Sequence, residues 1–209
     1  MIKNLLSQNL RIYFLSLCIV QMLLIFIQED IIGFRADFFQ ILEKLDRTGL
    51  EYAFLRLIEI GAYALVPLKI LANALTVGFI LWIGIFTFGY KAGFKEAFRV
   101  ALLAYSVFFI PQILKIIWFG FIDRSYSESD LNHFHGFSLV YLLNKESSET
   151  MLYAFLSSIN GALIIYIILL QNLMAEALKR KKSEMIWVVL VFYLGIAALW
   201  LAFTEIIFS

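Results

Sequence analysis

The sequence predicts an all-α fold: a polytopic membrane protein with a bundle of five transmembrane helices and interfacial amphipathic helices in the outer loops. Composition is the first observation, because 62% of the residues are hydrophobic and only 16% are charged, whereas soluble proteins average about 45–50% apolar residues. Segmentation is the second, because apolar runs long enough for a hydrocarbon core about 30 Å thick recur along the chain. These runs occupy 12–28, 60–90, 100–122, 151–175 and 185–204.

The first run, 12–28, follows Lys3 and Arg11, which is also the arrangement of a secretory signal. No small-residue cleavage site follows this run, which ends in amide and acidic side chains at 28–30. We therefore expect it to be retained as the first transmembrane helix.

The second run, 60–90, is longer than the hydrocarbon requires, and the mixed segment 50–60 is expected to run helically into it. Pro67 in this run and Pro111 in the third interrupt the helical hydrogen-bond pattern, so kinks are expected at both. Paired broken helices mark some transporter sites, but the chain has no internal repeat.

Small residues in two runs predict close helix contacts. Ala74 and Gly78 lie four residues apart in the second run, and Ser157 and Gly161 do so in the fourth. Small residues let helix backbones approach, and Asn160 beside the second pair is expected to hydrogen-bond across such a contact. In the first outer loop, the apolar spacing of 35–46 predicts a helix lying in the membrane interface.

The distribution of basic residues predicts which ends of the helices face the cytoplasm. One set of alternate gaps carries nine Lys and Arg residues, and the other carries six over far longer loops. The more basic side is cytoplasmic, so the N-terminus is expected inside and the C-terminus outside. The nine are Lys3, Arg11, Lys91, Lys95, Arg99, Lys179, Arg180, Lys181 and Lys182.

Residues 1–209 are expected to form a single transmembrane domain, because no linker or low-complexity segment divides them. The lone Cys18 has no partner for an internal disulfide. His133 and His135 supply only two candidate ligands where zinc needs three or four, so neither a metal nor a cofactor is expected. No short catalytic motif occurs either, and we expect a protein without enzymatic activity.

Charged residues at bilayer depth are costly, so they are the first candidates for function. Lys69 and Lys115 follow the two prolines, and under the predicted topology they belong to the outer half with Gln112, Asn160 and Glu205. In one interpretation these five residues form an outward-facing polar pocket for an anionic group. In the other, both lysines extend their flexible stems to the interface and need no partner.

One segment of the sequence resembles the Yip1 domain family. In the third run, Tyr105-Ser106 is followed by a few apolar residues and then by Ile110-Pro111, and the fourth contains Ser158-Ile159-Asn160-Gly161-Ala162 before a basic turn. The similarity covers roughly residues 60–205 and is to the bacterial branch of the family. It implies five helices with a cytoplasmic N-terminus and a role in membrane organisation or transport.

Two functional hypotheses lead, ahead of a third in which a membrane enzyme acts at the outer surface through His133, His135 and the neighbouring acidic residues. The first is a non-enzymatic, Yip1-like protein of the bacterial cytoplasmic membrane that organises lipids or membrane proteins through helix packing. Its expected partners are the bilayer, another membrane protein or a second copy of the chain, and not nucleic acid. The alternative is a transporter or permease-like subunit in which Pro67, Lys69, Pro111 and Lys115 line a path for an anionic or lipid-like substrate.

Overall fold

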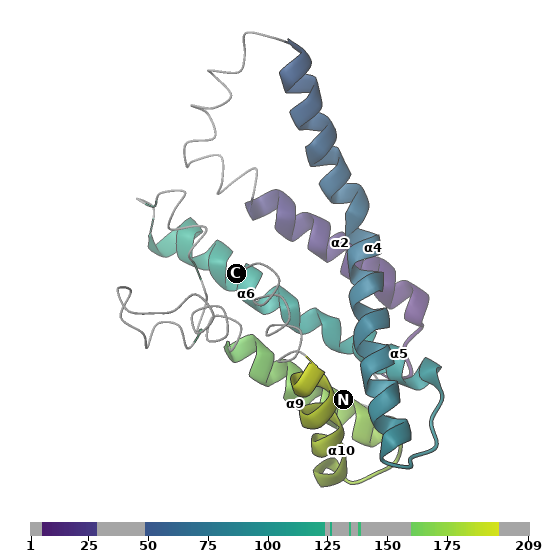
Figure 1. Ribbon diagram of the computed structural model, residues 1–209. Helices are drawn as coiled ribbons and strands as arrows, with labels where there is room; N and C mark the ends of the chain where they lie inside the picture. Colours follow the sequence, from purple (N-terminus) through teal and green to yellow (C-terminus); the bar gives the residue numbers. More distant parts are fainter. Residues whose placement is uncertain are drawn as a thin grey trace, which may run out of the picture.

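The computed structural model is all-helical in the residues that it describes, which are 6–28, 49–123, 126, 134, 138 and 160–196, with side chains in the second range from 61 onward. Five helices make up this part of the chain, and no strand is present in it (Figure 1). The predicted all-α class is therefore confirmed. The interfacial helix expected at 35–46 lies outside the described residues.

The first two helices are α2 (Leu10–Phe26) and α4 (Gly49–Thr87). The third runs from 94 to 122 in four parts, which are α5 (Phe94–Ala104), the 3₁₀ turn η3 (Tyr105–Phe108), α6 (Phe109–Ile117) and the π-helical turn η4 (Trp118–Ile122). The last two are α9 (Gly161–Ala177) and α10 (Lys182–Val188), and α10 continues into the π-helical η6 (Val189–Leu194).

Two of these helices are long and apolar enough to cross a membrane, namely Gly61–Thr87 of α4 and the continuous helix Phe94–Ile122. Both α2 and α9 are apolar but shorter. Residues 50–60 are helical and run into α4 as expected. Helix α9 begins at Gly161, because Asn160 is extended and caps it. Residues 151–159 of the predicted fourth run lie outside the described residues.

Helix α4 packs against α5, α2 and η6, while α9 packs against α5 and α10 (Figure 1). This arrangement creates two apolar cores. One lies between the C-terminal half of α4 and the helices α5, α9 and α10, around Leu81, Tyr166 and Met185. The other lies between α2, the middle of α4 around Ile70, and the 3₁₀ turn η3.

Gly78 shows why α4 and α5 approach closely. A Cβ added at this position would lie 2.8 Å from the Cα atom of Phe98, which no side-chain rotation relieves. Ala74, one turn earlier, is fully buried. The small-residue contact expected at Ala74 and Gly78 is therefore present, and α5 is its partner.

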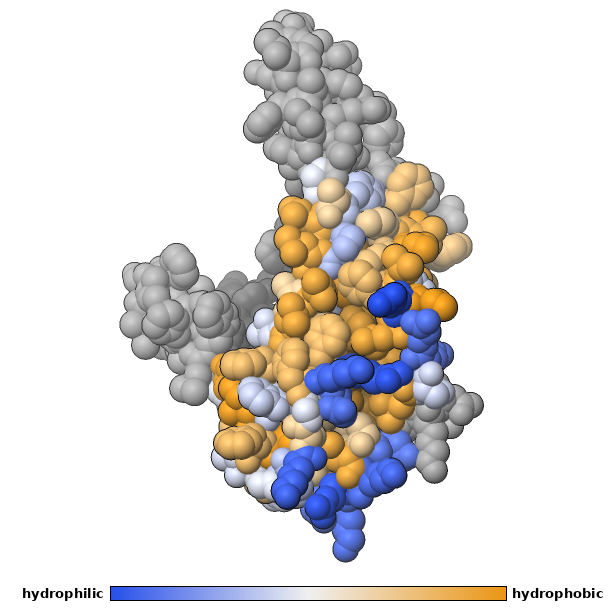
Figure 2. Space-filling view, turned by 90° about the vertical axis from the view of Figure 1, so that its right-hand side faces the viewer, coloured by the Kyte–Doolittle hydropathy of each residue, from blue (hydrophilic) through white to orange (hydrophobic). Residues whose placement is uncertain are grey.

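Much apolar surface remains exposed. Ile19, Phe86 and Phe121 are 65%, 77% and 73% exposed, respectively. In Figure 2, hydrophobic residues cover the middle of the visible face, and hydrophilic residues gather toward its lower end. A large contiguous apolar surface is typical of a contact with lipid or with another protein.

Candidate functional site

The predicted outer pocket requires Lys69, Gln112, Lys115, Asn160 and Glu205 to lie together. Glu205 is outside the described residues. No hydrogen bond or ion pair joins any two of the other four in the described part of the chain. Lys69 is exposed on α4, and Asn160 caps α9. Gln112 and Lys115 are three residues apart on α6, and the five-residue pocket stays a prediction.

Gln112 instead pairs with Gln21 of α2 through two reciprocal hydrogen bonds. Gln21 Nε2 donates to Gln112 Oε1 at 2.9 Å, and Gln112 Nε2 donates to Gln21 Oε1 at 3.2 Å. Gln28 Nε2 donates to the backbone carbonyl of Gln112 at 3.1 Å. Because a buried amide is costly without such partners, and Gln21 is buried, this glutamine contact fastens α2 to α6.

The helix changes type next to Pro111. Proline lacks the N–H that would bond to the carbonyl of Val107, and the 3₁₀ turn η3 immediately precedes this point. Lys115 follows one turn later and is half-buried, with no hydrogen-bond or ion-pair partner among the described residues. By contrast, α4 passes through Pro67 without a change of helix type.

Asn160 has a local structural role. Its side-chain Oδ1 accepts a hydrogen bond from the backbone N–H of Leu163 at 2.8 Å. Its backbone forms an isolated antiparallel bridge with Ser138. An Asn at this position satisfies one of the free N–H groups at the start of a helix. This contact is within α9, whereas the sequence predicted a hydrogen bond across two helices.

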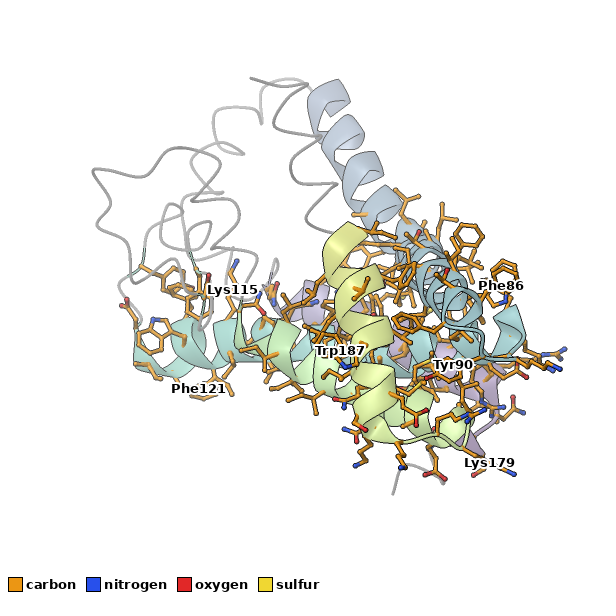
Figure 3. The ribbon with its side chains drawn as sticks, turned by 60° about the horizontal axis from the view of Figure 1, so that its bottom comes forward. Phe86, Tyr90, Lys115, Phe121, Lys179 and Trp187 are labelled. Atoms are coloured by element: carbon orange, nitrogen blue, oxygen red, sulfur yellow. The ribbon has the colours of Figure 1, made fainter. Side chains whose placement is uncertain are left out.

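At the other end of the helices, three basic segments meet. We call this region the basic end and define it as Arg11, Lys91, Lys95, Arg99, Lys179, Arg180, Lys181 and Lys182. Arg99 Nη2 donates to the backbone carbonyl of Gln8 at 2.6 Å, which joins the start of α2 to α5. Figure 3 places Tyr90 and Lys179 at this end, and Lys115 and Phe121 at the opposite end.

Two helices terminate at the basic end with the same backbone geometry. After α4, Tyr90 N donates to the Ile85 carbonyl and Gly89 N donates to the Phe86 carbonyl, both at 3.0 Å. After α9, Arg180 N donates to Ala175 O at 2.9 Å and Lys179 N donates to Glu176 O at 3.3 Å. Each is a Schellman motif, which satisfies the last carbonyl groups of a helix.

Gly89 and Lys179 have left-handed backbones in these two motifs, and the residues that follow them, Tyr90 and Arg180, contact each other. Arg180 Cζ lies 5.3 Å from the centre of the Tyr90 ring, within the range of a cation–π contact. The Tyr90 hydroxyl donates to Glu184 Oε2 at 3.3 Å. Desolvation and the neighbouring Glu184 carboxylate raise the pKa of Tyr90, so this hydroxyl stays protonated at neutral pH. We call Tyr90, Lys179, Arg180 and Glu184 the twin-cap face.

Sequence reasoning missed Gln21 and the special position of Lys179. Gln21 and Gln28 are seven residues apart, a spacing that places two residues on one face of a helix, which was a usable signal. Lys179 has a left-handed backbone with φ of 51°, and only Gly89 at φ of 73° shares that sign among the described residues. No residue type in 178–182 signals a left-handed turn.

The comparisons with known proteins give no relative for this chain. No protein-family model matches the sequence, and neither the curated proteins nor the solved structures contain a significant match. The Yip1 resemblance therefore stays a prediction from residues 60–205.

The chemistry of the two polar regions differs. The amides of the glutamine contact bond to each other, whereas the twin-cap face presents cations to the outside. No group of three His, Cys, Asp or Glu residues is placed to hold a metal ion in the part of the chain that the structure describes, and His133 and His135 lie outside it. The basic end is the candidate functional site, and the chemistry it favours is binding of anions.

Proposed function

We propose that this chain is a multi-pass, non-enzymatic protein of a bacterial cytoplasmic membrane, with five spans, a cytoplasmic N-terminus and an outward C-terminus. Its role is to organise lipids or membrane proteins through contacts of its helices, as the resemblance to the Yip1 domain family implies. The main support is the combination of exposed apolar helix sides with basic segments that meet at one end.

The apolar support is energetic. Leu15 and Ile19 on α2, Leu68 on α4 and Ile164 on α9 are all more than half exposed. Transfer of such side chains from water to an apolar environment gains about 1.5–3 kcal/mol each. A bilayer or a partner helix provides that environment for all three helices at once, whereas exposure to water is unfavourable for each of these side chains.

The electrostatic support concerns orientation. Basic residues from the start of α2, the turn between α4 and α5, and the turn between α9 and α10 lie at one end, as the alternating topology requires. Exposed aromatic residues accompany them, since Phe86 is 77% and Trp187 60% exposed. Aromatic side chains favour the headgroup region, and basic residues favour the cytoplasmic side.

The topology is tested with reporter fusions at both termini of the full chain. An alkaline phosphatase fusion is active only outside, and a green fluorescent protein fusion matures in the cytoplasm. We expect fluorescence at the N-terminus and phosphatase activity at the C-terminus. Both termini in the same compartment would overturn the five-span proposal.

The organising role is tested by crosslinking in native membranes. We expect a reproducible crosslinked species that contains this chain together with a second copy or another membrane protein, or a lipid that co-purifies with it. Recovery of the monomer alone, without any retained lipid, would count against this role.

A transporter is the second candidate, and one observation favours it. Lys115 is half-buried without a partner in the described residues, next to two changes of helix type at η3 and η4. Irregular helices near unpaired polar groups occur along substrate paths. Replacement of Lys69 and Lys115 by Leu would then abolish release of a small fluorescent anion from proteoliposomes at normal protein levels. Unchanged release would indicate lysines that only extend to the interface.

A further inference from the structure

The twin-cap face contains a residue choice that opposes local backbone preference. Gly89 and Lys179 occupy the same left-handed position of two equivalent Schellman motifs. Glycine adopts this conformation freely, whereas a residue with a Cβ is disfavoured there. Lys179 therefore strains the end of α9, and its side chain offers no compensating ion pair among the described residues. A charged residue retained at a position where its Cβ strains the backbone indicates a role in binding.

The surroundings of Lys179 are strongly cationic. Arg180, Lys181 and Lys182 follow it directly, and all four side chains are exposed. The Arg180 guanidinium is oriented by its contact with the Tyr90 ring. Glu184, the acidic residue of this face, accepts the Tyr90 hydroxyl. The face thus concentrates positive charge around one edge of the helix ends.

The position of this face suits a ligand in the headgroup layer. Trp187 is 60% exposed one to two turns after Lys182, and Phe86 is exposed one turn before Tyr90. Figure 3 shows Phe86 on the same side of the structure as Tyr90 and Lys179, and Trp187 nearer the middle. Aromatic side chains of this kind favour the level of lipid headgroups, where phosphate groups are found.

We infer that the twin-cap face binds the phosphate of an anionic phospholipid, with Lys179 and Arg180 as the contacting residues. Arginine offers a planar set of donors to phosphate, and lysine offers a mobile point charge. The apolar surface beside the face accommodates the acyl chains of the same lipid, which a free phosphate lacks. This inference rests on the proposed membrane function and deepens it by assigning the partner and its site.

The test measures lipid binding by the purified full chain in a zwitterionic detergent. Thermal unfolding is followed with added phosphatidylglycerol, with added phosphatidylcholine, or with inorganic phosphate alone. The key variant is Lys179→Gly, with Lys179→Asn as a second substitution that tolerates the left-handed backbone. Lys69→Gln is the matched control, because it also removes the charge of one exposed lysine, but on α4 and away from the twin-cap face.

We expect phosphatidylglycerol, and not phosphatidylcholine or inorganic phosphate, to stabilise the unmodified protein. Lys179→Gly should raise the unfolding temperature without lipid by about 2–4 °C, because it relieves the backbone. Both Lys179 variants should bind phosphatidylglycerol about fivefold more weakly, the effect of one surface charge, while Lys69→Gln should bind it normally.

Three results would overturn the inference. These are unchanged phosphatidylglycerol binding by both Lys179 variants, equal weakening by Lys69→Gln, and equal stabilisation by inorganic phosphate. The measurement in detergent does not depend on orientation in a bilayer. Its failure is therefore distinguishable from failure of the proposed topology, which the terminal fusions report.

Discussion

The glutamine contact joins two helices within their length, whereas the twin-cap face lies at the basic end, and the polar groups of the two regions have different partners. At the glutamine contact, Gln21 and Gln112 exchange two hydrogen bonds between α2 and α6. At the twin-cap face, Lys179 and Arg180 are exposed and project positive charge outward. The amides of the glutamine contact bond to each other, whereas the cations of the twin-cap face are available to a binding partner.

This difference separates contacts that hold the fold from groups available for binding. A buried amide that loses its partner destabilises the protein, because it was desolvated on folding. Replacement of an exposed lysine changes the stability of the protein little, and replacement of Lys179 by glycine is expected to raise it. Substitutions in the two regions should therefore differ in sign and in what they change, which makes the comparison testable.

The largest expected effect concerns the close contact of α4 with α5, which, like the glutamine contact, holds two helices together. Gly78→Ala places a Cβ 2.8 Å from the Phe98 Cα atom, so α4 and α5 must separate. We expect the free energy of unfolding to fall by about 1–3 kcal/mol. Gly61→Ala is the control, because nothing lies within 4 Å of its added Cβ, and it should be neutral or stabilising by up to about 1 kcal/mol.

Unfolding of both glycine variants is measured by circular dichroism during titration with a denaturing detergent. Equal stability of Gly78→Ala and Gly61→Ala would show that α4 and α5 are not held at this distance.

The next effect breaks the glutamine contact itself. Gln21→Leu leaves the Gln112 Oε1 atom without its donor, and we expect a loss of about 1–2 kcal/mol in unfolding free energy. The Phe108 carbonyl, 3.3 Å from Gln112 Nε2, limits the loss by retaining one hydrogen bond. The double variant Gln21→Leu, Gln112→Leu should lose less than the sum of the single variants, because no amide is stranded. Additive losses in this cycle would refute the pairing.

A smaller effect tests a polar group that neither region explains. The Tyr166 hydroxyl on α9 is fully buried and has no hydrogen-bond partner among the described residues. Its ring packs against Phe108 at 4.7 Å and Tyr193 at 5.5 Å between ring centres. Tyr166→Phe keeps these contacts and removes the unpaired hydroxyl, so stability should stay equal or rise by up to about 1 kcal/mol. A clear loss in the same titration would reveal a hydroxyl partner.

The sequence predicted the helical class and the meeting of the basic segments because both follow from residue composition along the chain. Apolar runs of this length predict helices, and the alternation of basic and less basic gaps predicts which turns share a side. The α4–α5 contact was also visible in the spacing of Ala74 and Gly78. These properties are local in sequence.

The candidate site was less predictable because its contacts depend on tertiary structure. Gln112 was selected, but its partner Gln21 lies 91 positions away, and nothing local connects them. An asparagine directly before an apolar run, such as Asn160, is a typical N-cap of a helix. This signal was overlooked because the apolar run extends to both sides of Asn160. The left-handed Lys179 and the stacking of Arg180 on Tyr90 arise from the way two helix ends meet.

The smallest expected effect sharpens the comparison from the side of the twin-cap face and depends on pH. Desolvation and Glu184 raise the pKa of Tyr90. The folded state therefore holds the hydroxyl proton more tightly than the unfolded state does. This stabilisation is fully present below the ordinary tyrosine pKa of about 10 and is lost as pH rises through the folded value.

We expect Tyr90→Phe to unfold at a slightly lower temperature than the unmodified protein at neutral pH, because it loses the bond to Glu184. The gap should close at alkaline pH, where the deprotonated tyrosine would face the carboxylate. In Glu184→Gln the neighbouring negative charge is absent and the folded-state pKa of Tyr90 is raised less, so the alkaline loss should be smaller and should end at a lower pH. If Tyr90→Phe and the unmodified protein unfold at the same temperature at every pH from neutral to strongly alkaline, the hydroxyl contributes nothing, and only the ring of Tyr90 orients Arg180.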